Sequence, residues 1–255
     1  MKIGVCAGAQ DAARVKASGC DYIEMNFTGL ARASEAEFAQ TRQALAQAGL
    51  RCEALNCFIP GEFKLCSPEL DREALAEFLS LGFERAKALG AEVVVFGSGA
   101  ARKLPEGVAK PEGWQTLAPL CRLAGDFAAQ TGIAIAIEPL CYAEDNAVNT
   151  VREGLSLMRL ANHPNVRLLA DMYHMGVNGE DYQDILQAGA DLRHCHIARP
   201  AGRVYPLPGD GYDYAPFFAA LRGVGYAGRI SIEAKAPNGP EDLAASVGYL
   251  RALQP

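Results

Sequence analysis

The stretch IAIAIEPLCYAEDNAVN, at residues 133–149, decides the fold class of this chain. Isoleucine alternates with alanine up to Ile137, so both faces of the segment are apolar, which is typical of a strand buried on both sides in a parallel sheet. The run ends at Glu138 and Pro139, and proline cannot continue the hydrogen-bond ladder because it has no N–H group. A carboxylate at the end of a buried strand is unfavourable unless it is paired or bound to a cation. We therefore expect Glu138 to lie at a rim of the sheet, facing a positive charge.

The same strand–helix alternation recurs along the whole chain. Eight apolar segments are typical of strands, and they lie at residues 2–7, 22–25, 51–56, 92–96, 133–137, 166–171, 192–197 and 229–233. Helical patterns follow them at residues 11–18, 34–49, 69–89, 114–131, 150–161, 182–188, 213–223 and 240–253. Such alternation predicts a parallel sheet with right-handed crossovers. Eight units within 255 residues predict an α/β fold closed into a (β/α)8 TIM barrel, a single domain over residues 1–255.

A doubly wound open sheet is the main alternative to a barrel. The first strand–helix turn, CAGAQDA at residues 6–12, lacks the glycine-rich fingerprint of dinucleotide-binding sheets. The chain also contains no P-loop sequence. Both observations favour the barrel.

Composition excludes several classes of protein. The formal net charge of −6 argues against a nucleic-acid surface, which is normally basic. The chain contains no run of about 18 apolar residues, so we expect no membrane span. The first apolar stretch is too short for a signal peptide. The eight cysteines form no C-x-x-C pair, so we expect free thiols in a cytoplasmic protein rather than disulfides or structural zinc.

Four successive predicted strands end in residues that bind divalent cations, namely Glu138, Asp171, His196 and Glu233. In a barrel of this kind the chemistry lies at the C-terminal ends of the strands. Three carboxylates and one imidazole suit Mn²⁺, Mg²⁺ or Co²⁺ better than a thiolate-rich zinc site, and without a cation the carboxylates would repel one another. His194 points to the same face as His196, and we prefer His196 as the ligand because it is nearer the strand end.

Each of these residues also has a purely structural interpretation. Glu138 and Glu233 could cap loops or pair with Lys or Arg, and Asp171 could cap the next helical turn. His196 could be a hydrogen-bonded core histidine. The candidate cation site therefore depends on the four residues occurring together.

Short motifs around these residues resemble a known family. They read Ile137-Glu138-Pro139-Leu140, Asp171-Met172-Tyr173-His174, His194-Cys195-His196-Ile197-Ala198 and Ile232-Glu233. With them, nearly the whole chain resembles the sugar isomerase/epimerase superfamily of xylose-isomerase-like barrels. Its nearer branches include ketose 3-epimerases of the D-tagatose/D-psicose type, hydroxypyruvate isomerase and inosose dehydratase.

The resemblance implies roles for seven residues. Glu138, Asp171, His196 and Glu233 would be metal ligands, Glu138 and Glu233 would also be the paired acid and base, and Glu144, His174 and Arg203 would bind substrate. Such an enzyme moves a proton next to the carbonyl of a small unphosphorylated sugar by way of a cis-enediolate, which a divalent cation stabilises. We expect a ketose 3-epimerase. Aldose–ketose or hydroxypyruvate-type isomerisation and an inosose dehydratase-type lyase reaction stay open as alternatives.

Two further classes fit less well, and several residues stay open. An endonuclease IV type of barrel would need more ligands than four histidines offer and a basic groove, and a non-catalytic sugar-binding barrel would not need both glutamates. We expect Arg102 and Lys103 to face water rather than a phosphate. Trp114 could line the sugar pocket or pack at a helix start. The apolar loop at residues 57–65 would tolerate a homo-oligomer, and either this loop or the one at residues 199–212 could act as a lid.

Overall fold

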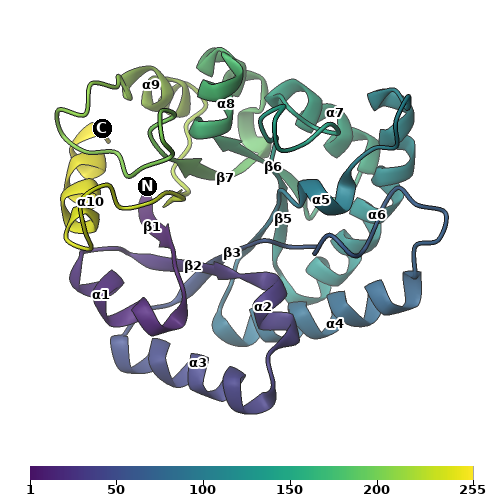
Figure 1. Ribbon diagram of the computed structural model, residues 1–255, viewed down its shortest axis with the longest axis horizontal. Helices are drawn as coiled ribbons and strands as arrows, with labels where there is room; N and C mark the ends of the chain where they lie inside the picture. Colours follow the sequence, from purple (N-terminus) through teal and green to yellow (C-terminus); the bar gives the residue numbers. More distant parts are fainter. Residues whose placement is uncertain (255) are drawn as a thin grey trace.

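Eight parallel strands close into a barrel in the order in which they occur along the chain (Figure 1). The computed structural model describes residues 1–254. The strands are β1 (Lys2–Cys6), β2 (Tyr22–Asn26), β3 (Cys52–Asn56), β4 (Val93–Phe96), β5 (Ala134–Ile137), β6 (Val166–Asp171), β7 (Leu192–Ile197) and β8 (Arg229–Ile232). Pairing between β1 and β8 closes the sheet, which confirms the predicted barrel and rules out the open sheet.

Helices surround the barrel (Figure 1). The α-helices are α1 (Ala12–Ala17), α2 (Phe27–Arg32), α3 (Glu35–Ala48), α4 (Arg72–Leu89), α5 (Gly99–Arg102), α6 (Lys110–Thr131), α7 (Val151–Ala161), α8 (Met172–Asn178), α9 (Ala215–Gly223) and α10 (Asp242–Leu253). Short 3₁₀ segments are η1 (Ala9–Asp11), η2 (Tyr182–Gln187) and η3 (Gly189–Asp191). Within residues 1–254, every helix falls short of what a bilayer crossing needs in length and hydrophobicity.

Apolar side chains fill both sides of the sheet, which explains why the strands are apolar on both faces. The larger cluster lies between the strands and the helices. A smaller cluster contains Tyr22, Ala54, Val93, Val95, Ala136 and Leu169. The strands therefore bury apolar side chains on both of their faces, as strands of a parallel barrel do.

Two helix starts and one helix type differ from the sequence prediction. The helix predicted from residue 69 begins at Arg72, because the Asp71 side chain accepts a hydrogen bond from the Ala74 N–H at 3.0 Å. The helix predicted from residue 114 begins at Lys110, with proline in its first turn. The segment at 182–188 forms 3₁₀ rather than α-helix. The predicted helix at 34–49 is confirmed, including a capping box at Ser34.

Three short helices, α2, α5 and α8, were not predicted. Each directly follows a strand or a strand-end loop and is at most seven residues long. So short a segment carries no clear helical periodicity in the sequence. In α2 and α8 the residue that ends the strand, Asn26 or Asp171, caps the helix through its side chain.

Three apolar side chains of the loop between β3 and α4 are packed into the protein. Phe58, Ile59 and Leu65 are buried, and the Phe58 ring contacts the rings of Phe27 and Phe96 edge to face. These apolar side chains therefore pack against other parts of the same chain. All eight cysteines are free thiols, as predicted.

Arg102 corrects the sequence prediction, because it is fully buried instead of facing water. Its guanidinium forms an ion pair with Asp145 at 2.7 Å and donates hydrogen bonds to the carbonyl oxygens of Phe96 and Glu138 at 2.8 and 2.7 Å. The sequence gives no sign that Arg102 is buried, because its partner Asp145 lies 43 residues away. Arg102 thus joins the ends of β4 and β5 to the following loop. Lys103 is exposed, as predicted.

Trp114 lies within α6, and its indole N–H donates to the carbonyl oxygen of Ala147 at 2.9 Å. The structure therefore favours the packing role over a place in the sugar pocket.

Replacing Arg102 with Leu is expected to lower the free energy of unfolding by about 3–5 kcal/mol, because the buried Asp145 carboxylate loses its charge partner. Chemical denaturation measures the change. The neighbouring exposed Lys103→Leu serves as the control and is expected to shift stability by no more than about 0.5 kcal/mol. Equal effects of the two variants would show that the Arg102 network does not hold the loops.

Glu180 makes the start of α7 sensitive to pH. One carboxylate oxygen accepts a hydrogen bond from the Val151 N–H at 2.8 Å, and the other has no partner among the described residues. Burial raises the pKa of Glu180 to about 7, with a further contribution from the nearby Asp184 carboxylate. Folding therefore favours the protonated form.

Because the folded-state pKa of Glu180 lies above the unfolded value of about 4.3, its favourable contribution is complete below that value and is lost as the pH rises through 7. Glu180→Gln stays neutral and keeps an acceptor for Val151. We expect the variant to melt above the wild type at about pH 8, with the difference shrinking towards about pH 4. Thermal melts across this range measure it, with the exposed Glu77→Gln as control. A difference that does not depend on pH would contradict this account.

Candidate metal centre and active site

The four predicted ligand residues converge at the C-terminal ends of neighbouring strands. Glu138 follows β5, Asp171 ends β6, His196 lies in β7 and Glu233 follows β8. Asp171 and His196 are register partners in the parallel ladder. One ligand atom from each of the four residues lies within 4.8 Å of all the others. Barrel closure thus brings together side chains that are 95 positions apart in the sequence at most, from Glu138 to Glu233.

The His196 ring lies at the centre of this group. Its Nδ1 atom is 2.8 Å from Glu138 Oε1, 3.5 Å from Glu233 Oε2 and 3.8 Å from Asp171 Oδ2. His196 is fully buried. Nδ1 and the three carboxylates therefore face a common point.

The donor set fits a divalent cation. Asp171 Oδ1 accepts hydrogen bonds from the backbone N–H groups of Tyr173 and His174 at 2.6 and 3.3 Å, whereas Oδ2 is buried without a hydrogen-bond partner among the described residues. A buried carboxylate oxygen without a partner is unfavourable unless a cation occupies the space beside it. Three oxygen ligands and one imidazole nitrogen are a set suited to Mn²⁺, Mg²⁺ or Co²⁺.

Glycine after β4 leaves the room that Glu138 needs. A Cβ atom added at Gly97 would lie 2.3 Å from Glu138 Oε2, which is closer than real Cβ atoms approach. The position of this carboxylate therefore explains why a glycine, Gly97, directly follows β4.

Burial and neighbouring charges shift the pKa values of the three carboxylates in different directions. Burial raises the pKa of Asp171 to about 6, to which the neighbouring Glu138 carboxylate adds. Burial likewise raises the pKa of Glu138, against the opposing effect of His196. Burial also opposes ionisation of Glu233, but His196 and Arg203 overcome it and hold its pKa at about 2. A cation at the centre would stabilise the ionised form of all three carboxylates.

The three predicted substrate residues lie around the same centre. His174 Nδ1 accepts a hydrogen bond from the Cys141 N–H at 3.0 Å, so Nε2 carries the ring proton of the neutral form, and burial lowers the pKa of this histidine. Nε2 lies 3.7 Å from Asp171 Oδ2 and has no hydrogen-bond partner within residues 1–254. His174 therefore presents a free N–H donor beside the candidate metal centre.

Arg203 comes from the loop after β7 and forms an ion pair with Glu233. Its Nη1 atom lies 3.4 Å from Glu144 Oε1, and its guanidinium stacks over the Tyr173 ring at 4.4 Å. Arg203 has a φ of +47°, a backbone conformation that is uncommon for a residue with a side chain and often marks functional sites. The structure thus brings all seven sequence-predicted site residues together.

Sequence reasoning missed two residues that contact the centre. Glu24 in β2 is fully buried and lies 2.9 Å from His196 Nε2. Asn56 at the end of β3 donates to Glu233 Oε1 at 3.3 Å. Glu24 carried the same sequence signal as Glu138, a carboxylate within an apolar strand, YIEMN at residues 22–26. Asn56 had no comparable signal.

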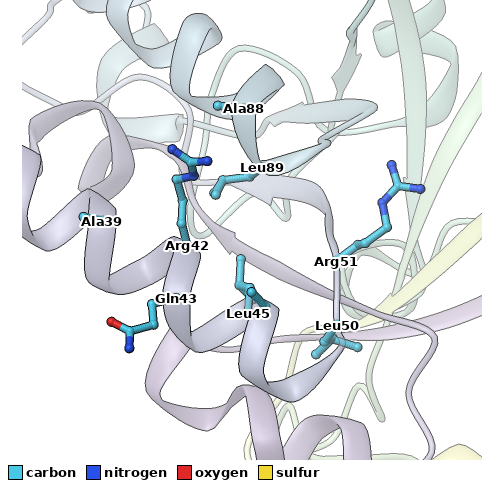
Figure 2. A pocket seen from close by; sticks show the side chains of 9 residues that line it. Ala39, Arg42, Gln43, Leu45, Leu50, Arg51, Ala88 and Leu89 are labelled. Carbon is cyan, nitrogen blue, oxygen red and sulfur yellow. The ribbon is translucent and has the colours of Figure 1, made fainter.

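One cavity adjoins the centre and another does not. A cavity of about 440 Å³ opens at the C-terminal ends of β1, β2 and β3, and Cys6, Gln10, Glu24, Asn26 and Asn56 are among its lining residues. A hollow of about 470 Å³ lies outside the barrel between α3 and α4 (Figure 2). Its lining includes Leu50 and Arg51, which precede β3, so it lies towards the opposite ends of the strands and away from the candidate ligands.

Comparison with known proteins identifies relatives along most of the chain. The L-ribulose 3-epimerase of Methylomonas sp. (strain DH-1) is 32% identical over 237 residues, which are 89% of this chain and 78% of that protein. The ketose 3-epimerase of Arthrobacter globiformis is 34% identical over 42% of this chain and 37% of its own. A crystal structure of D-allulose 3-epimerase from Methylomonas sp. in complex with D-allulose is similar with a TM-score of 0.84 at 26% identity, covering 99% of this chain and 96% of that one.

A family profile described as the xylose isomerase-like TIM barrel matches residues 12–253. This range contains every strand from β2 to β8 and all the candidate ligands. By fold, by the strand-end residues and by this match, the chain belongs to the xylose isomerase-like TIM barrel family.

Proposed function

We propose that this chain is a divalent-metal-dependent sugar epimerase, and specifically a ketose 3-epimerase. The observation that carries the proposal is the placement of Glu138 and Glu233 on opposite flanks of the group formed with Asp171 and His196, after β5 and β8. Two carboxylates on well-separated strands could face a substrate from two sides. The names of the relatives, which include L-ribulose, ketose and D-psicose 3-epimerases, support this reaction.

Glu138, Asp171, His196 and Glu233 would hold the cation, which we propose to be Mn²⁺, Mg²⁺ or Co²⁺. When bound, it would polarise the substrate carbonyl and stabilise the negative charge that develops when the neighbouring carbon loses its proton. In the absence of such charge stabilisation, a general base alone contributes only about 10²–10⁴-fold.

The proton itself would be moved by the two glutamates. One carboxylate removes the proton from carbon 3 of the ketose, and the other returns a proton to the opposite face, which inverts that carbon. In the reverse direction the two exchange roles. His196 and Arg203 keep Glu233 ionised, so we assign Glu233 as the base for the epimer whose carbon-3 proton faces it.

His174 and Arg203 would orient the sugar. The free Nε2–H of His174 is a hydrogen-bond donor for a substrate oxygen near the centre, and the Arg203 guanidinium adds a fixed cationic fork. Glu144, which contacts Arg203, would accept a hydrogen bond from a substrate hydroxyl.

The cavity beside β1, β2 and β3 supports an unphosphorylated substrate. Its lining offers the side-chain amides of Gln10, Asn26 and Asn56 and the thiols of Cys6 and Cys57, and within the described residues it includes no Lys, Arg or His. A phosphate group would need a cationic partner there. Amides can bind the hydroxyls of a sugar.

We further propose that the chain forms one domain. We also propose that it works in the cytoplasm, because its cysteines are free thiols. A homo-oligomer remains a proposal as well. In the apolar loop at residues 57–65, Phe58, Ile59 and Leu65 lie in the core, so these three side chains are not available for a subunit contact.

Proton NMR of a ketose panel in D₂O tests the reaction. With Mg²⁺-loaded enzyme we expect deuterium at carbon 3 together with a new diastereomer, and no turnover of the corresponding sugar phosphates. Exchange at carbon 1 or 2 with an aldose appearing would identify an isomerase instead. Loss of water from inositol-type substrates would identify a dehydratase, and an absence of exchange in every sugar would overturn the proposal.

Replacing Glu233 with Gln is expected to slow carbon-3 exchange by about 10²–10⁴-fold at saturating metal, because the variant cannot take up the proton. The exposed Glu84→Gln on α4 serves as a matched control and should exchange at the wild-type rate. Full turnover by Glu233→Gln with every active sugar would refute the paired-carboxylate mechanism.

A further inference from the structure

A carboxylate buried inside the barrel holds the ring of the candidate metal-binding histidine from behind. Glu24 in β2 is fully buried, and its two oxygens contact two histidines of β7. Oε1 lies 2.9 Å from His196 Nε2, and Oε2 lies 2.8 Å from His194 Nε2. We infer that Glu24 is a positioning residue for the cation, keeping the proton of His196 on Nε2 and so leaving Nδ1 free as a ligand atom. This inference rests on the proposed metal centre.

The geometry of His196 makes the two ring nitrogens unequal. In this structure both ring nitrogens lie beside a carboxylate: Nδ1 is 2.8 Å from Glu138 Oε1, and Nε2 is 2.9 Å from Glu24 Oε1. Only Nδ1 also faces Asp171 and Glu233, at 3.8 and 3.5 Å, so a cation held by the candidate ligands would lie on the Nδ1 side. A neutral imidazole has one N–H and one lone pair, and the partner of one nitrogen decides which atom carries the proton. An ionised carboxylate accepts hydrogen bonds and cannot donate one. A cation at the candidate site would take the place of a proton on Nδ1, while Glu24 holds the remaining proton on Nε2, so the lone pair of the neutral ring would point at the cation.

A glutamate suits this position because both of its oxygens are acceptors. Each of them receives one histidine N–H, so His194 and His196 take the same tautomer. A glutamine has one acceptor oxygen and one NH₂ donor, so one histidine would have to move its proton to Nδ1. For His196, that proton would occupy the nitrogen that faces the cation.

A chain of hydroxyl groups fixes Glu24 in place. Ser231 in β8 donates to Glu24 Oε2 at 2.5 Å, and the Tyr22 hydroxyl lies 2.7 Å from the same serine oxygen. Since the single serine proton goes to Glu24, Tyr22 is the donor to Ser231. Both side chains are fully buried. The orientation of the carboxylate is therefore set by β2 and β8 together.

A second buried strand glutamate provides a matched comparison. Glu53 in β3 is 3% exposed and pairs with Arg229 at 2.6 Å and Lys2 at 2.7 Å. Lys2 and Arg229 begin β1 and β8, so Glu53 belongs to the opposite end of the barrel. Its carboxylate is buried like that of Glu24, but among the described residues its ion-pair partners are Lys2 and Arg229 and not a candidate ligand.

Calorimetric titration of the metal-free protein with Mn²⁺ tests the inference. Glu24→Gln is expected to weaken Mn²⁺ binding by about 10–100-fold, the usual effect of removing a carboxylate that orients a histidine ligand. Glu53→Gln is expected to bind Mn²⁺ as the wild type does, although both variants melt at lower temperature than the wild type. Equal Mn²⁺ affinity in the Glu24→Gln variant and the wild type would overturn the inference while leaving the metal centre intact. If the wild type itself binds no Mn²⁺, the metal centre and the inference both fail.

A measurement on the wild type avoids any dependence on how the variant folds. Long-range ¹⁵N–¹H correlation spectra of the Mg²⁺-loaded protein distinguish the two histidine tautomers. We expect the proton of His196, and that of His194, on Nε2. A proton on Nδ1 of His196 in the loaded protein would contradict the inference even if metal binds.

Discussion

Mutual repulsion between buried carboxylates is the constraint on which this structure depends. Glu138, Asp171 and Glu233 reach within 4.8 Å of one another and of His196, where burial favours neutral forms and raises the pKa of Glu138 and Asp171. Such a group is stable only when positive charge compensates it. His196 and Arg203 supply part of that charge at Glu233. The remaining deficit, together with the unpaired Asp171 Oδ2, is what makes this end of the barrel suited to a divalent cation.

The rest of the barrel positions this group from several sides. Register pairing places Asp171 beside His196, and Gly97 leaves room for Glu138. Buried Arg102 binds the Glu138 carbonyl oxygen. Glu24 approaches His196 from the barrel interior. These contacts come from different strands and loops, so the geometry of the site depends on closure of the whole barrel rather than on any one motif.

Features with a local signal were predictable from the sequence. Strand–helix alternation predicted the barrel, and the position of Glu138, Asp171, His196 and Glu233 at strand ends predicted their convergence, because parallel strands end at one rim. Helix starts depended on single capping contacts such as that of Asp71. They were predicted correctly only where the capping residue immediately precedes the helical pattern.

Features that depend on distant partners were not predictable. Arg102 resembles any solvent-facing arginine until the fold brings Asp145 to it. The contact of Asn56 with Glu233 joins residues 177 positions apart. The helix α8 is too short to show a period, yet its cap, Asp171, is also a candidate ligand through its other oxygen. One side chain thus has both the structural and the functional role that the sequence presented as alternatives.

Anomalous diffraction from crystals grown with Mn²⁺ tests the central claim most directly. The account predicts one strong peak, within bonding distance of carboxylate oxygens of Glu138, Asp171 and Glu233 and of Nδ1 of His196. Absence of a peak at this position at saturating Mn²⁺, or a peak held by other residues, would contradict it.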